Sequence, residues 1–146
     1  MKLFNIYGKI VNKNVSEYLI DWDASSRSKI QFKTKQFLKN YWKNHIVYEE
    51  FPVFGSLLKV DIINATRKIA VEVHGPQHSS YNKFFHGESR LNYLKSIKRD
   101  VAKENWLTLN KFVLIEIYHD EVDSLNASFF KEKHNIILWC QSTPYS

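Results

Sequence analysis

The chain has 146 residues, 44% of them hydrophobic and 15% aromatic, which is enough apolar surface for one core, so we expect a single domain over residues 1–146. Lys and Arg number 21 against 15 Asp and Glu, and the net charge of +6 favours a polyanionic partner. The single cysteine, Cys140, excludes an internal disulfide, and the lack of a long apolar run or a signal-peptide core predicts a cytoplasmic protein that does not contact the membrane.

Residues 1–24 contain two strand-like runs on either side of the polar turn NKN at residues 12–14, and they predict an accessory antiparallel pair. Residues 25–44 change to helical spacing, with Ser25 or Ser26 as the candidate N-cap. The inward stripe of this helix consists of Ile30, Thr34, Phe37, Leu38, Tyr41 and Trp42.

The remaining face of the same helix is basic, since residues 25–44 contain no Asp or Glu. A face of one sign predicts a phosphate-binding surface, and a solvated face without a partner stays open as the alternative. The expected DNA-binding residues on it are Arg27, Lys29, Lys33, Lys35 and Lys39.

Three strand-like runs follow within residues 46–75, and the short connection NATRK predicts a hairpin between the second and the third. With the turn centred near Ala65 and Thr66, Asp61 lies opposite Ala70 and diagonal to Glu72. Alternation along the third strand then puts one set of side chains in the core, namely Ile69, Val71 and Val73, and the other set on the opposite face, namely Ala70, Glu72 and His74.

Residues 88–106 predict a helix whose core stripe is Leu94, Ile97 and Val101. Residues 111–118 predict a further strand, and residues 120–134 a short helix. The order of helix, three strands, helix, strand and helical tail is typical of an α/β domain.

Asp61 and Glu72 each interrupt an apolar strand, where burial of an unpaired carboxylate is costly. A divalent cation removes this cost, and a cation held by two carboxylates and a backbone carbonyl is what phosphodiester hydrolysis uses. An acid on an edge strand facing solvent is the alternative for each residue taken alone, but the pair with His74 beside it favours a metal site.

The run VDIINATRKIAVEVHG, residues 60–75, resembles the core motif of PD-(D/E)XK nucleases, in which an Asp on one strand precedes Glu-x-Lys on the next, with His74 at the lysine position. It is most similar to the branch of the very short patch repair endonucleases and the homing endonucleases with an E-D-x-H-D pattern. That branch shows His-Gly and then another His, here His74-Gly75 and His78. An Arg-Asp pair on a helix follows, here Arg99-Asp100 in RDVAKENWL, and then a strand, here VLIEIYHDE.

The resemblance covers residues 25–122 and implies an α/β restriction-endonuclease-like fold, a mixed central sheet flanked by helices, with residues 1–24 as accessory strands and 123–146 as a tail. It implies that Asp61 is the principal metal ligand, and that Glu72 or the Val73 carbonyl completes the site. Asp100 and His78 would orient and deprotonate water, and His74 would lie near the scissile phosphate. The first acidic position of the pattern falls on Glu50, with Glu49 and Glu17 as alternatives.

The resemblance further implies Mg²⁺, or Mn²⁺ in its place, and hydrolysis of double-stranded DNA, with a homodimer as one way to cut both strands. Gln77 and Lys83 are further candidates for DNA contact. A structural zinc is not expected, because the cysteines of such a site are missing. A nuclease selective for junctions or mismatches and a non-catalytic nucleic-acid-binding module remain the alternatives.

Overall fold

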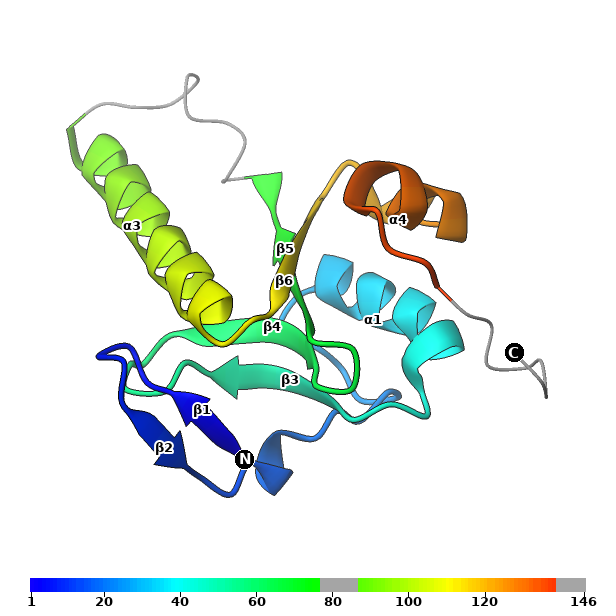
Figure 1. Ribbon diagram of the computed structural model, residues 1–146. Coiled ribbons are helices and arrows are strands. Elements are labelled where there is room, and N and C mark those ends of the chain that lie inside the picture. The colour runs from blue at the N-terminus through cyan, green and yellow to red at the C-terminus, as the bar shows by residue number, and fades with distance from the viewer. Residues whose placement is uncertain (77–86, 139–146) are drawn as a thin grey trace.

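The computed structural model describes residues 1–76 and 87–138 of the chain. Two short strands open it, and a four-stranded sheet with three α-helices follows (Figure 1). The strands are β1 (Lys2–Phe4), β2 (Ile10–Asn12), β3 (Val47–Pro52), β4 (Lys59–Asn64), β5 (Ile69–His74) and β6 (Val113–Tyr118). The α-helices are α1 (Lys29–Trp42), α3 (Gly87–Leu109) and α4 (Ala127–His134). Two short 3-10 helices are η1 (Ser16–Tyr18) and η3 (Val122–Ser124).

The larger sheet has the order β3-β4-β5-β6 and is mixed. The first three strands pair antiparallel, as hairpins allow, whereas β5 and β6 pair parallel and need the crossover that α3 provides. The predicted element order and the mixed α/β sheet flanked by helices are therefore confirmed.

The N-terminal pair is antiparallel as predicted, but the predicted position of its turn is wrong. Lys2 pairs with Asn12, so NKN ends the pair, and the turn lies at residues 5–9. Gly8 there has a φ of 81°, a left-handed conformation that glycine adopts without a steric penalty.

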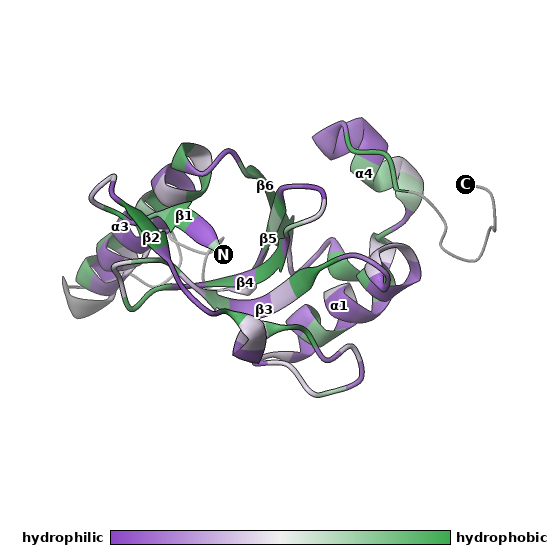
Figure 2. Cartoon of the chain, turned by 60° about the horizontal axis from the view of Figure 1, so that its bottom comes forward, coloured by the Kyte–Doolittle hydropathy of each residue, from purple (hydrophilic) through white to green (hydrophobic). Residues whose placement is uncertain are grey.

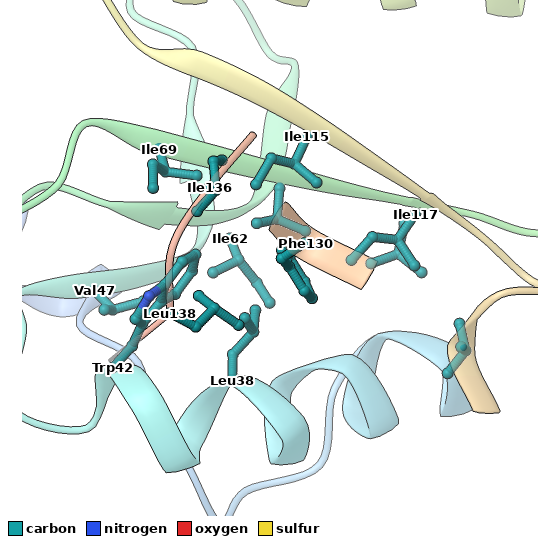
Figure 3. Close-up of a cluster of buried hydrophobic side chains, with 13 residues drawn as sticks. Leu38, Trp42, Val47, Ile62, Ile69, Ile115, Ile117, Phe130, Ile136 and Leu138 are labelled. Carbon is teal, nitrogen blue, oxygen red and sulfur yellow. The ribbon is translucent and has the colours of Figure 1, made fainter. Parts of the chain in front are cut away.

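Each face of the larger sheet carries its own hydrophobic cluster. On one face α1 and α4 cover the sheet, and Figure 3 shows Leu38 and Trp42 of α1 pointing toward Ile62, with Phe130 of α4 beside them. On the other face Trp106 at the C-terminal end of α3 packs in a second cluster with strand residues of the sheet. The predicted alternation of β5 is confirmed, because its odd-numbered residues 69–73 join the first cluster and Ala70 joins the second.

Helix α1 has the amphipathic pattern that its sequence predicts. Thr34, Leu38 and Trp42 are buried, and the rest of the predicted stripe packs against the same cluster. Figure 2 shows α1 alternating between hydrophilic and hydrophobic bands, while β6 is largely hydrophobic. The cap prediction is wrong by a few residues, because the side chain of Ser28 accepts the hydrogen bond from the Gln31 amide.

The predicted core stripe of α3 is wrong. Leu94, Ile97 and Val101 are 50%, 40% and 48% exposed, respectively. The face of α3 that is turned toward the sheet carries Asp100 and Lys103, which line the pocket, and Trp106, while the N-terminal end of the helix runs away from the sheet (Figure 1). Within residues 1–76 and 87–138, no helix combines the length and the apolar character needed to cross a membrane.

Candidate active site

Three carboxylates, those of Glu50, Asp61 and Glu72, lie side by side across neighbouring strands and form a row of acids. The register of β3 and β4 puts Glu50 opposite Asp61, and the register of β4 and β5, continued by one residue, puts Asp61 opposite Glu72. The predicted pairing of Asp61 with Ala70 is wrong, because Ala70 pairs with Ile63 and the turn is centred further along the chain. The real register brings the two acids closer together than the diagonal arrangement predicted from the sequence.

β4 and β5 separate at this pair of acids. Beyond the last paired residues, the Asp61 amide donates to Oε2 of Glu72 at 3.0 Å, and the Val73 amide donates to Oδ2 of Asp61 at 2.8 Å. Carboxylates therefore accept from two backbone amides here, and Figure 1 shows β5 and β6 rising away from β3 and β4. The separation leaves room between the strands for the acids to face a pocket.

Glu50 has a φ of 51°, which is unusual for a residue other than glycine inside a strand. Its side chain is 30% exposed and reaches the guanidinium group of Arg27. Burial and the charge of Asp61 raise the pKa of Glu50, although Arg27 partly offsets this. Backbone strain of this kind clusters at functional sites, where surrounding contacts hold it in place.

Asp61 is the most deeply buried acid of the row, with a side chain that is 4% exposed. Burial and the neighbouring Glu72 raise the pKa of Asp61 from its ordinary value of 3.8 to about 7, although the Val73 amide and Arg27 favour its charged form. A buried carboxyl group with so strongly raised a pKa is typical of functional sites.

Two side-chain cations reach the row of acids from opposite sides. Arg27 lies just before α1, and its Nη2 is 3.1 Å from Oδ1 of Asp61. Lys103 comes from α3, and its Nζ is 2.7 Å from Oε1 of Glu72. The Arg27 side chain is 64% exposed and the Lys103 side chain 18%, so the first is held much less firmly than the second.

Glu116 continues the row on β6, where the register puts it opposite Glu72, and His74 lies two residues beyond Glu72 on β5. Its Nε2 is 3.3 Å from Oε1 of Glu116, and its ring stacks on Tyr118 with a centroid distance of 5.1 Å. Burial lowers the pKa of His74, but the hydrogen bond to Glu116 and the charges of Glu116, Asp100 and Glu72 outweigh burial and raise it. His74 is thereby favoured as a cation beside the acids.

A pocket of about 630 Å³ opens over these residues between the start of α1, the sheet and α3. Of the predicted catalytic residues, it brings together Glu50, Asp61, Glu72, His74 and Asp100, and the Val73 backbone lines it as well. The two alternatives to Glu50 for the first acidic position, Glu49 and Glu17, differ in where they lie. Glu49 lines the pocket but bonds to α1, whereas Glu17 is exposed on η1 and is not among the lining residues.

The predicted exposure of Lys35 is wrong. Lys35 is fully buried, and its Nζ donates to the carbonyl oxygens of Asp21 and Ala24 and to Oε1 of Glu49 at 3.0 Å. The residue therefore ties the segment before α1 to β3 and cannot contact DNA from this position. Ser26 and Gln31 also donate to Glu49, so the carboxylate is well satisfied.

The other predicted lysines of α1 lie at its surface. Lys29 is exposed, Lys33 pairs with Asp123 at 3.1 Å, and Lys39 pairs with Asp23 at 2.7 Å. Exposed pairs of this kind contribute little to stability and exchange readily for a phosphate. The remaining predicted residues, Gln77, His78 and Lys83, lie outside the described residues.

The donor set suits a hard cation such as Mg²⁺. Two carboxylates, Asp61 and Glu72, lie beside the backbone of Val73, and Mg²⁺ commonly takes one or two carboxylates and keeps several waters. In the described part of the chain, no three Asp, Glu, His or Cys side chains are grouped so that they could hold a metal ion. A cation at this site would therefore rest on the two carboxylates and a carbonyl.

Sequence reasoning missed two residues of the site, Glu116 and Lys103. Glu116 interrupts the apolar run VLIEIY in the same way as Asp61 and Glu72 interrupt theirs, so the same signal was present. Lys103 follows Asp100 by three residues on a helix, a spacing that puts both side chains on one face.

No family model matches the chain, and no solved structure matches it. Uncharacterized protein 033L of Invertebrate iridescent virus 3 is 37% identical over 62 residues, which are 40% of this chain and 32% of the viral protein. The match thus spans about a third of that relative's length, and the relative's name states no activity.

Proposed function

We propose that the protein is a metal-dependent DNA endonuclease with a restriction-endonuclease-like core. The observation that carries the proposal is the row of Glu50, Asp61 and Glu72 across β3, β4 and β5, at the point where β4 and β5 separate. Asp61 and Glu72 are buried side by side in the pocket, and a buried acid with a strongly raised pKa, such as Asp61, is typical of functional sites.

Asp61 and Glu72 would hold Mg²⁺, or Mn²⁺ in its place, together with the Val73 carbonyl. When bound, the ion supplies charge stabilisation for the phosphate and a more acidic water. Asp100 and His78 would orient and deprotonate the attacking water. His74, held by Glu116, would stand near the scissile phosphate as a positive group.

The partner in this proposal is double-stranded DNA, and the protein works in the cytoplasm, as a homodimer where both strands are cut. The basic residues Arg27, Lys29, Lys33 and Lys39 would contact the phosphates on the side of the pocket where α1 begins.

A non-catalytic nucleic-acid-binding module on the same scaffold is the second candidate. One observation favours it, since Arg27 and Lys103 already neutralise Asp61 and Glu72 without a metal ion. In such a module the acids and their cations would serve only as a structural ion-pair network.

The test is a cleavage assay on supercoiled plasmid, duplex oligonucleotides and four-way junctions, with Mg²⁺, Mn²⁺ or EDTA. We expect Asp61→Asn to abolish Mg²⁺-dependent cleavage while leaving DNA binding nearly intact, because the ligand is removed and the basic surface stays. Asp120→Asn is the matched control, since Asp120 is exposed and does not line the pocket. Cleavage by Asp61→Asn at the wild-type rate would refute the proposal, and DNA binding without any cleavage by the wild type would favour the binding module.

A further inference from the structure

Arg27 is bound to two acids at once through a single guanidinium group. Its Nη2 is 3.1 Å from Oδ1 of Asp61, and its Nε is 3.4 Å from Oε1 of Glu50. The other oxygen of Asp61, Oδ2, accepts from the Val73 amide inside the sheet. Oδ1 is therefore the oxygen that Asp61 offers to a cation in the pocket, and Arg27 occupies it.

A divalent ion on the same oxygen would lie next to the guanidinium group, and like charges at contact distance repel strongly in a partly buried site. Metal and Arg27 therefore compete for Asp61. The two internal cations differ in how easily they can leave, because the Arg27 side chain is 64% exposed whereas that of Lys103 is 18% exposed and lies within 2.7 Å of Glu72.

The position of Arg27 in the chain puts other basic residues close to its side chain once that side chain leaves Asp61. It directly precedes Ser28, the N-cap of α1, and follows Ser25 and Ser26, which line the pocket and its neighbour. Lys29 and Lys33 line the neighbouring pocket, so a freed guanidinium group would join a basic rim. Arginine binds phosphate through two parallel hydrogen bonds.

We propose that Arg27 is an exchangeable cation that occupies Oδ1 of Asp61 in the metal-free protein and moves to a substrate phosphate when a divalent ion binds. This inference rests on the proposed metal-dependent nuclease function and adds a coupling to it. Metal binding releases a phosphate-binding residue, so the metal strengthens nucleic-acid binding, and nucleic acid strengthens metal binding by the same factor.

The first test measures Mn²⁺ affinity by isothermal titration calorimetry for wild type, Arg27→Gln and Lys59→Gln, without nucleic acid. Lys59 is exposed and lines the same pocket, and among the described residues it contacts neither carboxylate within ion-pair distance, so its variant removes one positive charge without removing the competitor. We expect Arg27→Gln to bind Mn²⁺ about tenfold more tightly, the effect of removing one charge-assisted competitor, and Lys59→Gln to change affinity by less than about threefold.

Arg27→Lys separates charge from geometry, since lysine keeps the charge but cannot bond Glu50 and Asp61 through a planar fork. Its Mn²⁺ affinity should lie between those of wild type and Arg27→Gln. Thermal unfolding of each variant checks that the fold is intact, as the exposure of Arg27 predicts. Equal Mn²⁺ affinity of wild type and Arg27→Gln, or equal gains in Arg27→Gln and Lys59→Gln, would overturn the inference.

The second test compares the salt dependence of duplex binding in EDTA and in Ca²⁺, with the duplex checked for intactness on a gel. In Ca²⁺, the slope of log affinity against log salt should be shallower by about 0.9 in Arg27→Gln than in wild type, because the variant binds one phosphate fewer. In EDTA, the two slopes should agree, because Arg27 is then held by the acids. A reduced slope in EDTA as well would mean that Arg27 binds phosphate without exchange, which contradicts the inference.

The two proposals fail in different ways. If wild type binds no divalent ion at all, the nuclease proposal fails and the exchange of Arg27 fails with it. If wild type binds Mn²⁺ and cleaves DNA, but Arg27→Gln behaves like Lys59→Gln, only the exchange is wrong.

Discussion

Asp61 is a carboxyl group buried beside another acid, and the free energy of the metal-free fold depends on whether it is charged. Its partners in the metal-free state are Arg27, the Val73 amide and the carboxylate of Glu72. Arg27 and the Val73 amide favour the charged form, whereas burial and Glu72 disfavour it and raise the pKa of Asp61. This balance is the reason why we propose that Asp61 serves cation binding instead of stability.

The raised pKa of Asp61 predicts how the stability of the metal-free protein depends on pH. The folded state binds this proton up to about pH 7, whereas the unfolded chain releases it near 3.8, so the stabilising contribution is complete below about 3.8 and is lost as pH rises through about 7. Asp61→Asn cannot release the proton. At pH 8 in EDTA it should therefore be more stable than wild type by on the order of 1–3 kcal/mol, and near pH 4 this advantage should vanish.

Urea unfolding at several pH values measures this difference, with Asp120→Asn as the exposed Asp→Asn control. Saturating Mg²⁺ should reverse the order by stabilising wild type alone. A variant that is less stable than wild type at pH 8 in EDTA would show that the charged carboxylate is well satisfied by Arg27.

At the scale of single elements, helix α1 is fixed to its surroundings by one buried cation, Lys35. The side chain of Lys35 joins the helix to β3 through Glu49 and to the preceding segment through two carbonyl oxygens. That segment leads into Arg27, so the hydrogen bonds of Lys35 hold one wall of the pocket in position. A lysine that looks like part of a basic surface in the sequence is thus a structural residue.

Lys35→Met should destabilise the fold by about 3–5 kcal/mol, because it leaves the mostly buried Glu49 without its cation and two carbonyl groups without a donor. Lys33→Met on the exposed face of the same helix should change stability by less than about 1 kcal/mol. Chemical denaturation of both variants gives the comparison. Similar small effects would mean that water replaces the Lys35 hydrogen bonds.

Helix α3 contributes to the core through its C-terminal end, and this predicts a contrast between two leucines. Leu38→Ala on α1 removes a fully buried side chain and should cost about 2–5 kcal/mol. Leu94→Ala on α3 removes a side chain that is 50% exposed and should cost less than about 1 kcal/mol. Equal costs would show that the N-terminal half of α3 is packed after all.

At the scale of the whole molecule, the net charge of +6 matters through its distribution. Lys29 and Lys33 line a pocket that shares Ser25 and Ser26 with the pocket over Asp61 and Glu72. Positive charge therefore borders the row of carboxylates. A polyanion attracted by such a rim would be guided toward the site.

Replacement of Lys29, Lys33 and Lys39 by Gln should weaken binding to all duplex sequences alike and flatten the plot of log affinity against log salt by roughly 0.9 for each phosphate that the variant no longer binds. The control is the triple Gln variant of Lys2, Lys9 and Lys111, which removes the same charge from exposed positions outside the pocket. Fluorescence anisotropy at several salt concentrations measures both slopes. If the control flattens the plot as much as the α1 variant, DNA binds to another surface of the protein.

How far the sequence predicts this protein can be judged from particular residues. Periodicity correctly predicts the buried stripe of α1 and the two faces of β5, because both follow from backbone geometry alone. The acids at 61 and 72 stand out because a charge inside an apolar strand is costly wherever the strand lies. These are local properties of the chain.

Tertiary structure decided the remaining points, since each depends on groups distant in the chain. Lys35 is buried because Glu49 and the carbonyl oxygens of Asp21 and Ala24 converge on it, and Leu94 is exposed because α3 leaves the sheet. Spacing within one helix predicts which residues share a face, but it does not show what covers that face. The sequence alone thus determined the elements and the acids, while the packing of elements decided which cations meet those acids, because ion pairing depends on distance through space.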